Sequence, residues 1–166
     1  MKLAELELQG AGDSRLLLEA YRGRVAVLLL GNRGCQSQCH RFVDELRADP
    51  DTREVPILQI AFLKGVPAGL WHFAKREIVR GVERQRLANA AQRERQGLPP
   101  VDEENILPVG LDWSGTLCAR FNLNSRTQNA RAVVVDRHGS VVFSGDAVPH
   151  DDVVRSISVA SQGARA

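Results

Sequence analysis

The chain has 166 residues, which is enough for one hydrophobic core and short for two. Its 22 lysines and arginines nearly balance 20 aspartates and glutamates, so a net charge of +2 gives no indication of a polyanionic partner. Three cysteines are too few for a disulfide framework. We therefore expect one domain over residues 1–166, held together by its core.

The first residues, Met1 to Asp13, contain no apolar block of signal-peptide length, and no stretch of the chain approaches membrane-spanning length. As written, the sequence predicts a soluble, cytoplasmic protein without a membrane span. A secreted protein produced without its signal peptide would begin in the same way, so a periplasmic location stays open.

Alternating leucines in the first ten residues predict a short strand that ends at Gly10-Ala11-Gly12. Asp13 or Ser14 is suited to cap a helical turn through Leu16 to Tyr21. The run Val25 to Leu30 is apolar on both faces, which is typical of a central strand covered on both sides.

This run leads directly into Cys35-Gln-Ser-Gln-Cys39-His40. The segment His40 to Ala48 has apolar residues at helical spacing, so we expect Cys39 in or near a first helical turn. The positive end of a helix dipole favours thiolates, and the sequence therefore predicts a site of thiol chemistry here.

The next predicted elements are a buried strand over Val55 to Leu63, parallel to the first, and a long helix over Leu70 to Gln96. The helix offers one apolar stripe: Leu70, Phe73, Ala74, Ile78, Val82, Leu87, Ala90 and Ala91. Its other faces are rich in arginine. Because no aromatic residues interleave with these arginines in a groove-binding motif, we expect a solvated face and no nucleic-acid partner.

The last third predicts a short strand over Ile106 to Leu111, a helix over Asp112 to Leu123 with Cys118 turned inward, and a β-hairpin over Ala130 to Ser144. An amphipathic helix over Val148 to Val159 closes the chain, and a frayed tail follows from Ala160. This order of strands and helices defines an α/β sandwich.

The second half resembles the redoxin branch of the thioredoxin-like superfamily. The resemblance rests on the helix end Leu117 to Leu123, the strand Ala132 to Asp136, Gly139, and the strand from Val141. It implies a three-layer α/β/α sandwich with a mixed sheet and an enlarged helical insertion at about residues 66–108.

The first hypothesis for the two cysteines is a dithiol–disulfide couple in a thiol–disulfide oxidoreductase. In CxxC chemistry the more exposed amino-terminal cysteine attacks, and by analogy Cys35 would attack and Cys39 would resolve the mixed disulfide, with a protein thiol or disulfide as partner and no bound cofactor. Thioredoxin-type enzymes also carry a proline just before the hairpin strand. This chain has Asn129-Ala130-Arg131 there.

The CxxxC spacing is also similar to the Sco-type copper-handling proteins, in which two thiols and a distant histidine hold copper. That resemblance implies Cys35 and Cys39 as copper ligands, and its histidine position falls near Gln128 or Asn129. From the residues alone, His40 is a further soft ligand. The other histidines are isolated in the sequence: His72, His138 and His150.

A third hypothesis is a non-catalytic binding module on a thioredoxin fold, which would use the arginine-rich helix or the groove. The carboxyl-terminal half is similar to YtfJ-type proteins, which lack the cysteine pair. We expect Cys118 to be core packing and Arg131 to be salt-bridged, with a third redox partner and an anion-binding or thiolate-orienting residue as their alternatives. The peroxiredoxin motif has no counterpart before Cys35.

Overall fold

A computed structural model describes residues 7–11 and 15–163, and within them it contains one mixed sheet of seven strands in the order β2-β1-β5-β4-β3-β6-β7. The strands are β1 (Glu7–Gly10), β2 (Arg15–Leu17), β3 (Ala26–Gly31), β4 (Ile57–Phe62), β5 (Val109–Asp112), β6 (Arg131–Val135) and β7 (Val141–Asp146). The central strands β3, β4 and β5 are parallel, as the sequence predicted for the first two. The outer strands are antiparallel to their neighbours.

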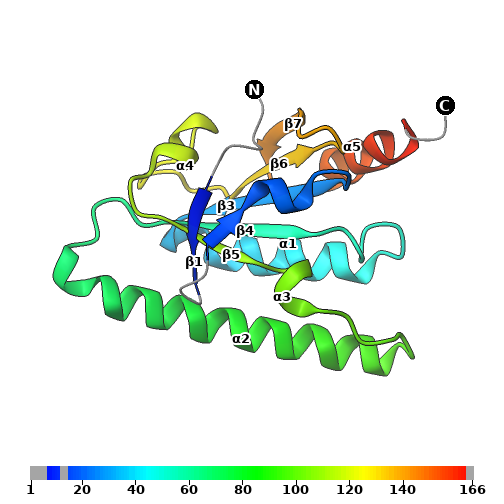
Figure 1. Cartoon of the computed structure of the whole chain (residues 1–166), viewed down its shortest axis with the longest axis horizontal. Helices are drawn as coiled ribbons and strands as arrows, with labels where there is room; N and C mark the ends of the chain where they lie inside the picture. Colours follow the sequence, from blue (N-terminus) through cyan, green and yellow to red (C-terminus); the bar gives the residue numbers. More distant parts are fainter. Residues whose placement is uncertain (1–6, 12–14, 164–166) are drawn as a thin grey trace.

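Helices cover both faces of this sheet (Figure 1). They are α1 (Gln36–Ala48), α2 (Trp71–Arg95), α3 (Glu103–Ile106), α4 (Thr116–Arg120) and α5 (Asp151–Gln162). Successive residues of β3 point to opposite faces: Val27 and Leu29 pack with α1 and α5, and Leu28 and Leu30 pack with α4. The predicted α/β/α sandwich, with the apolar run as its doubly covered central strand, is confirmed.

The predicted helical insertion is present, and α2 is its main element. In Figure 1 this long green helix lies below α1, on the side of the sheet that α1 covers. The predicted apolar stripe is wrong, however, because Leu70, Phe73 and Leu87 are exposed. The buried side chains of α2 are Val82, Gln85, Asn89 and Arg93.

Polar contacts explain which face of α2 is buried. The Gln85 Oε1 atom accepts a hydrogen bond of 2.8 Å from Gln59 Nε2 of β4. Arg86 donates to the Leu107 carbonyl at 3.2 Å, and Arg93 donates to the Pro99 carbonyl at 2.8 Å. The arginine-rich faces are therefore only partly solvated. Those two contacts lie within the insertion, and Arg93 also pairs with Glu54 at 2.6 Å, which fastens the insertion to the segment before β4.

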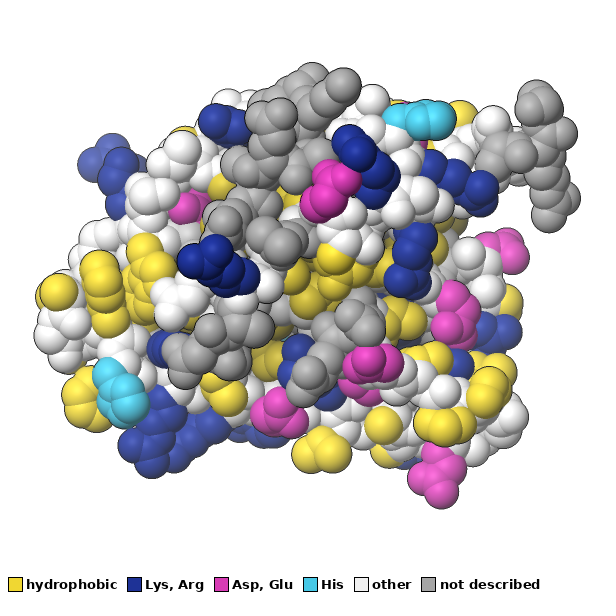
Figure 2. Space-filling view, viewed as in Figure 1, with side chains coloured by type: hydrophobic (Ala, Val, Ile, Leu, Met, Phe, Trp, Pro, Cys, Tyr) yellow, Lys and Arg dark blue, Asp and Glu magenta, His cyan; other side chains and the backbone are white. Residues whose placement is uncertain are grey.

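The start of α2 carries an exposed apolar patch formed by Leu70, Trp71 and Phe73, whose side chains are 45–60% exposed. Figure 2 shows hydrophobic side chains gathered at this end of the molecule. The rings of Trp71 and Trp113 stack with their centroids 4.8 Å apart. Trp113 also donates to Gln9 at 2.9 Å, so the stack joins the insertion to the β5–α4 connection and to β1.

Near the amino terminus the structure differs from the prediction. Residues Arg15–Leu17 form β2, paired with β1, and the helical turn is a 3-10 helix over Leu18–Tyr21 only. The pairing with β1 decides this difference, because it supplies partners for the Arg15–Leu17 backbone that the local sequence does not reveal. The proposed caps Asp13 and Ser14, like the earliest leucines of the predicted first strand, lie outside the described residues.

The predicted helix over Asp112 to Leu123 is shorter in the structure, because Asp112 ends β5 and α4 begins at Thr116. The Asp112 carboxylate accepts a 2.9 Å hydrogen bond from the Cys118 amide, and it thereby caps α4 from the strand. The helix stops before Asn122, which adopts a positive φ of 60°.

The β6–β7 hairpin is confirmed, and Gly139 takes the left-handed φ of +80° that its turn requires. The closing helix α5 is also confirmed, and it continues to Gln162 rather than fraying from Ala160. Across residues 7–11 and 15–163, no helix combines the length and the apolarity that crossing a membrane requires.

Candidate functional site

The two motif cysteines lie where β3 passes into α1, at the carboxyl end of a central parallel strand. A short 3-10 helix, Arg33–Cys35, joins the two elements, and Asn32 caps it by accepting a 3.1 Å hydrogen bond from the Cys35 amide. Cys39 lies in the first turn of α1, as predicted. The Cys35 side chain is completely buried and that of Cys39 is 8% exposed, so the order of exposure that the CxxC analogy implies is wrong for this structure.

Gly31, the last residue of β3, shows how closely the cysteines approach each other. A β-carbon placed on Gly31 would lie 2.6 Å from the Cys39 sulfur and 3.6 Å from the Cys35 Cβ. The Cys39 sulfur therefore occupies the space that a side chain at position 31 would need. Both cysteines are free thiols, and the Cys39 sulfur and the Cys35 β-carbon lie next to the same point of β3.

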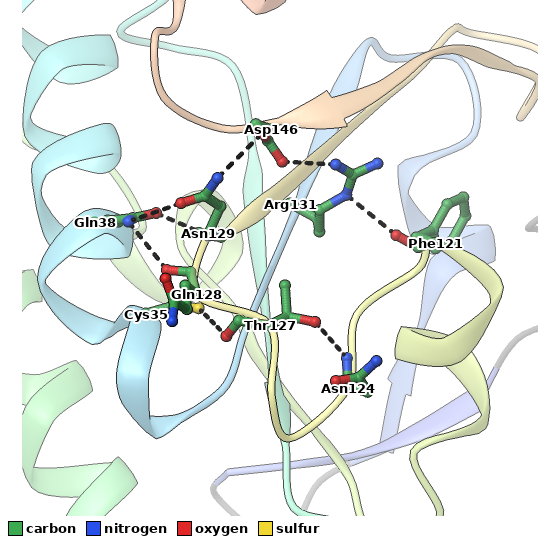
Figure 3. Close-up of polar contacts among 10 residues, drawn as sticks. Cys35, Gln38, Phe121, Asn124, Thr127, Gln128, Asn129, Arg131 and Asp146 are labelled. Atoms are coloured by element: carbon green, nitrogen blue, oxygen red, sulfur yellow. Dashed lines mark hydrogen bonds and ion pairs between the residues drawn. The ribbon is translucent and has the colours of Figure 1, made fainter.

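The connection between α4 and β6 covers the site, and we call residues 124–130 the covering loop (Figure 3). Asn32 holds this loop by donating to the Asn124 and Thr127 carbonyls, both at 2.8 Å. The Cys35 thiol donates to the same Thr127 carbonyl at 3.5 Å.

Gln38, between the two cysteines, holds the other end of the covering loop. Its amide nitrogen donates to the Gln128 carbonyl at 3.1 Å, and its amide oxygen accepts from the Ala130 N–H at 2.8 Å. Asn129 extends this network by donating to Asp146 at 3.2 Å. Sequence reasoning missed both Asn32 and Gln38, because no local pattern indicates their partners on the covering loop.

Burial, and to a lesser extent the neighbouring Cys35, raises the pKa of the Cys39 thiol to about 12. The prediction that the helix dipole would favour a thiolate is therefore wrong for Cys39. Removing the sulfur from water outweighs the attraction of the helix end, because desolvation of a buried charge is the larger effect.

This pKa sets the pH dependence of Cys39 reactivity. In the reduced protein, the rate of Cys39 alkylation should rise about tenfold per pH unit from pH 7 to 10, because the thiolate fraction grows in that proportion below the pKa. Tandem mass spectrometry of the tryptic peptide 34–41 separates Cys39 from Cys35. A plateau below about pH 9, typical of an ordinary thiol, would contradict this prediction.

The other candidate residues are not at the thiols. Arg131 is salt-bridged to Asp146 at 2.6 Å, as expected, and also donates to the Phe121 carbonyl at 3.2 Å (Figure 3). Cys118 is fully buried among the residues that pack on the α4 face, whereas Cys35 and Cys39 pack on the α1 face. Burial, followed by the Asp112 carboxylate, raises the Cys118 pKa.

The described part of the chain contains no group of three or more His, Cys, Asp or Glu side chains that could hold a metal ion. His40, His72 and His138 are exposed, and His150 Nδ1 lies 2.8 Å from a carboxylate oxygen of Glu45. The positions at which the Sco resemblance implies a histidine, 128 and 129, are on the covering loop as glutamine and asparagine. Among the residues that the structure describes, Cys35 and Cys39 are thus two soft ligands without a third.

No family model matches this sequence, and no curated protein does. Among solved structures, it is similar to an exposed lipoprotein thioredoxin from Streptococcus pneumoniae, with a TM-score of 0.59, 17% identity, and 93% and 98% of the two chains covered. A secreted disulfide oxidoreductase from Mycobacterium tuberculosis has a TM-score of 0.53 and 12% identity, over 94% and 96%. BsSco, a member of the Sco family of cytochrome c oxidase assembly proteins, has a TM-score of 0.58 and 14% identity, over 96% and 93%.

These structures match nearly the whole of this chain at low sequence identity. The chain therefore has the thioredoxin-like fold. The likeness extends over nearly the full length of each protein, and it is a likeness of fold.

Proposed function

We propose that this chain carries out thiol–disulfide exchange with a protein partner through Cys35 and Cys39. The observation that supports this most strongly is the convergence of both cysteines on Gly31, at the carboxyl end of the central strand of a thioredoxin-like fold. The cysteines are four residues apart and begin the same helix, so closing a disulfide between them needs only a short loop.

When the chain is oxidised and its partner is reduced, the Cys35 thiolate attacks one sulfur of the partner disulfide and releases the other sulfur as a thiol. The Cys39 thiolate then attacks the Cys35 sulfur, which closes the Cys35–Cys39 disulfide and releases the second partner thiol. Two electrons and two protons pass from the two cysteines to the partner disulfide. The reverse sequence reduces the protein and oxidises the partner.

The environment of the cysteines favours a slow, reducing couple. A low thiol pKa stabilises the reduced form and makes a couple more oxidising, whereas here burial holds the Cys39 pKa near 12. We therefore expect a reduction potential nearer to the ~−270 mV of thioredoxin than to the ~−120 mV of a strong oxidant. The high pKa also slows the resolving step, in which Cys39 must lose its proton.

The test is a redox titration under metal-free conditions, with free thiols trapped and counted across a graded dithiothreitol series. We expect one reversible two-electron transition, which Cys35→Ser abolishes. Cys118→Ser is the matched control and should leave the transition unchanged, because Cys118 packs on the opposite face of the sheet.

If no intramolecular disulfide forms at any potential, the proposal is overturned. Since both thiols are buried under the covering loop, that result would favour a non-catalytic binding module on this fold. A Cys35→Ser/Cys39→Ser variant that keeps full biological activity would favour the same alternative.

A further inference from the structure

Cys35 is shielded by the covering loop, and its thiol makes a polar contact with that loop. Its side chain has no exposed surface, and its thiol donates to the Thr127 carbonyl at 3.5 Å. An incoming disulfide must reach the sulfur in line with its own S–S bond. The covering loop must therefore move before Cys35 can react.

Gln38 holds this loop in an unusual way. One side-chain amide satisfies two backbone groups that flank Asn129, the Gln128 carbonyl at 3.1 Å and the Ala130 N–H at 2.8 Å. A backbone donor and a backbone acceptor on either side of one residue are the groups that a neighbouring strand engages in a parallel ladder. The Gln38 amide thus takes the place that another chain's backbone would occupy (Figure 3).

We infer that Gln38 is a latch that keeps Cys35 unreactive until its amide is displaced from the covering loop. The inference builds on the proposed function by treating Cys35 as the attacking thiol, and it adds the residue that controls access to it. Asn32 holds Asn124 and Thr127, and release of the latch frees residues 128–130, which directly follow the Thr127 carbonyl that contacts Cys35.

The latch predicts a specific change in thiol reactivity. In the fully reduced protein, Gln38→Ala should speed alkylation of Cys35 about ten- to a hundredfold, the effect of losing the two hydrogen bonds to the loop backbone on the opening equilibrium. The reaction rate follows this equilibrium as long as the loop closes faster than the reagent reacts. Iodoacetamide is the probe, and tandem mass spectrometry gives the initial rate at each cysteine.

Two controls separate the latch from general destabilisation. Gln36→Ala changes the same residue type two positions earlier, at an exposed side chain, and should leave the Cys35 rate unchanged. Cys118 is buried on the opposite face of the sheet and reports on global unfolding. An unchanged Cys35 rate in Gln38→Ala, or an equal acceleration of Cys35 and Cys118, would overturn the latch.

A second measurement needs no substitution and applies even where Gln38→Ala does not fold. In the native protein, opening of the latch releases the Ala130 N–H and uncovers Cys35 together. Hydrogen exchange at Ala130 and alkylation at Cys35 should therefore give the same opening equilibrium, within about threefold. Unequal values would show that Cys35 becomes accessible by another route. Because both measurements use reduced protein, they do not depend on whether a disulfide forms in the redox titration.

Discussion

Gly31→Ala should lower the free energy of unfolding by about 1–3 kcal/mol, the usual cost of forcing an extra methyl group into a packed interior. The new methyl carbon would lie 2.6 Å from the Cys39 sulfur, far inside van der Waals contact. Without that collision, replacing glycine in a strand would stabilise the protein slightly, because alanine restricts the unfolded chain. Here the collision decides the sign.

A double-mutant cycle tests the cause of this loss. In a Cys39→Ala background the sulfur is gone, and the methyl group at position 31 fills part of the space that it leaves. The double variant should therefore be more stable than the sum of the two single changes predicts, by about 1 kcal/mol or more. Urea denaturation with unchanged m-values provides the free energies.

Gly81→Ala is the matched control for this series. Gly81 lies inside α2, and a β-carbon placed there meets no atom within 4 Å. This substitution should raise stability by about 0.5–1 kcal/mol, because alanine is the better helix former. If Gly31→Ala were also stabilising, the close packing of Cys39 against β3 would be disproved.

Arg47→Leu should cost about 3–4 kcal/mol, because it leaves several buried carbonyl groups without a hydrogen-bond donor. The Arg47 guanidinium donates to the carbonyls of Arg53 and Val55 at 2.8 Å, and to that of Ile106 at 2.9 Å. Its side chain is 7% exposed. Burial lowers the Arg47 pKa to about 10, which still leaves the group charged at neutral pH.

Arg41→Leu, in the same helix, is the control for Arg47→Leu. The Arg41 side chain is 68% exposed and pairs with Glu45 at 2.7 Å, so its loss should change stability by no more than about 0.5 kcal/mol. Arg47→Lys should recover only part of the loss, because an ammonium group lacks the planar fork that reaches carbonyls on two segments. An Arg47→Leu protein within about 1 kcal/mol of the parent would contradict the assigned role.

The parts of the fold that could be predicted from sequence are those with a strong local pattern. The β3 strand is apolar at every position, and the β6–β7 hairpin combines two apolar strands with a glycine turn. The buried face of α2 could not be predicted in this way. Gln85 and Arg93 are buried there because they bond to groups elsewhere in the chain, while the more apolar residues of the helix remain exposed.

The same distinction applies to the site. The spacing of Cys35 and Cys39 after a buried strand identified the thiols, because it is a local feature of the sequence. The groups that control them come from far away: Gln38 bonds to Gln128, 90 residues along the chain, and Asn32 bonds to Thr127, 95 residues away. Only the folded sheet, which places β6 beside β3, brings these groups together.

The stack of Trp71 on Trp113 gives the protein an intrinsic optical probe of one particular junction. The chain has two tryptophans, and both are in this stack. Their fluorescence and exciton-coupled circular dichroism therefore report whether the start of α2 is docked on the β5–α4 connection. Alkylation of Cys35 and Cys39 reports instead on the thiol site at the end of β3, which β4 separates from β5. The two signals together distinguish undocking of the insertion from opening of the thiol site.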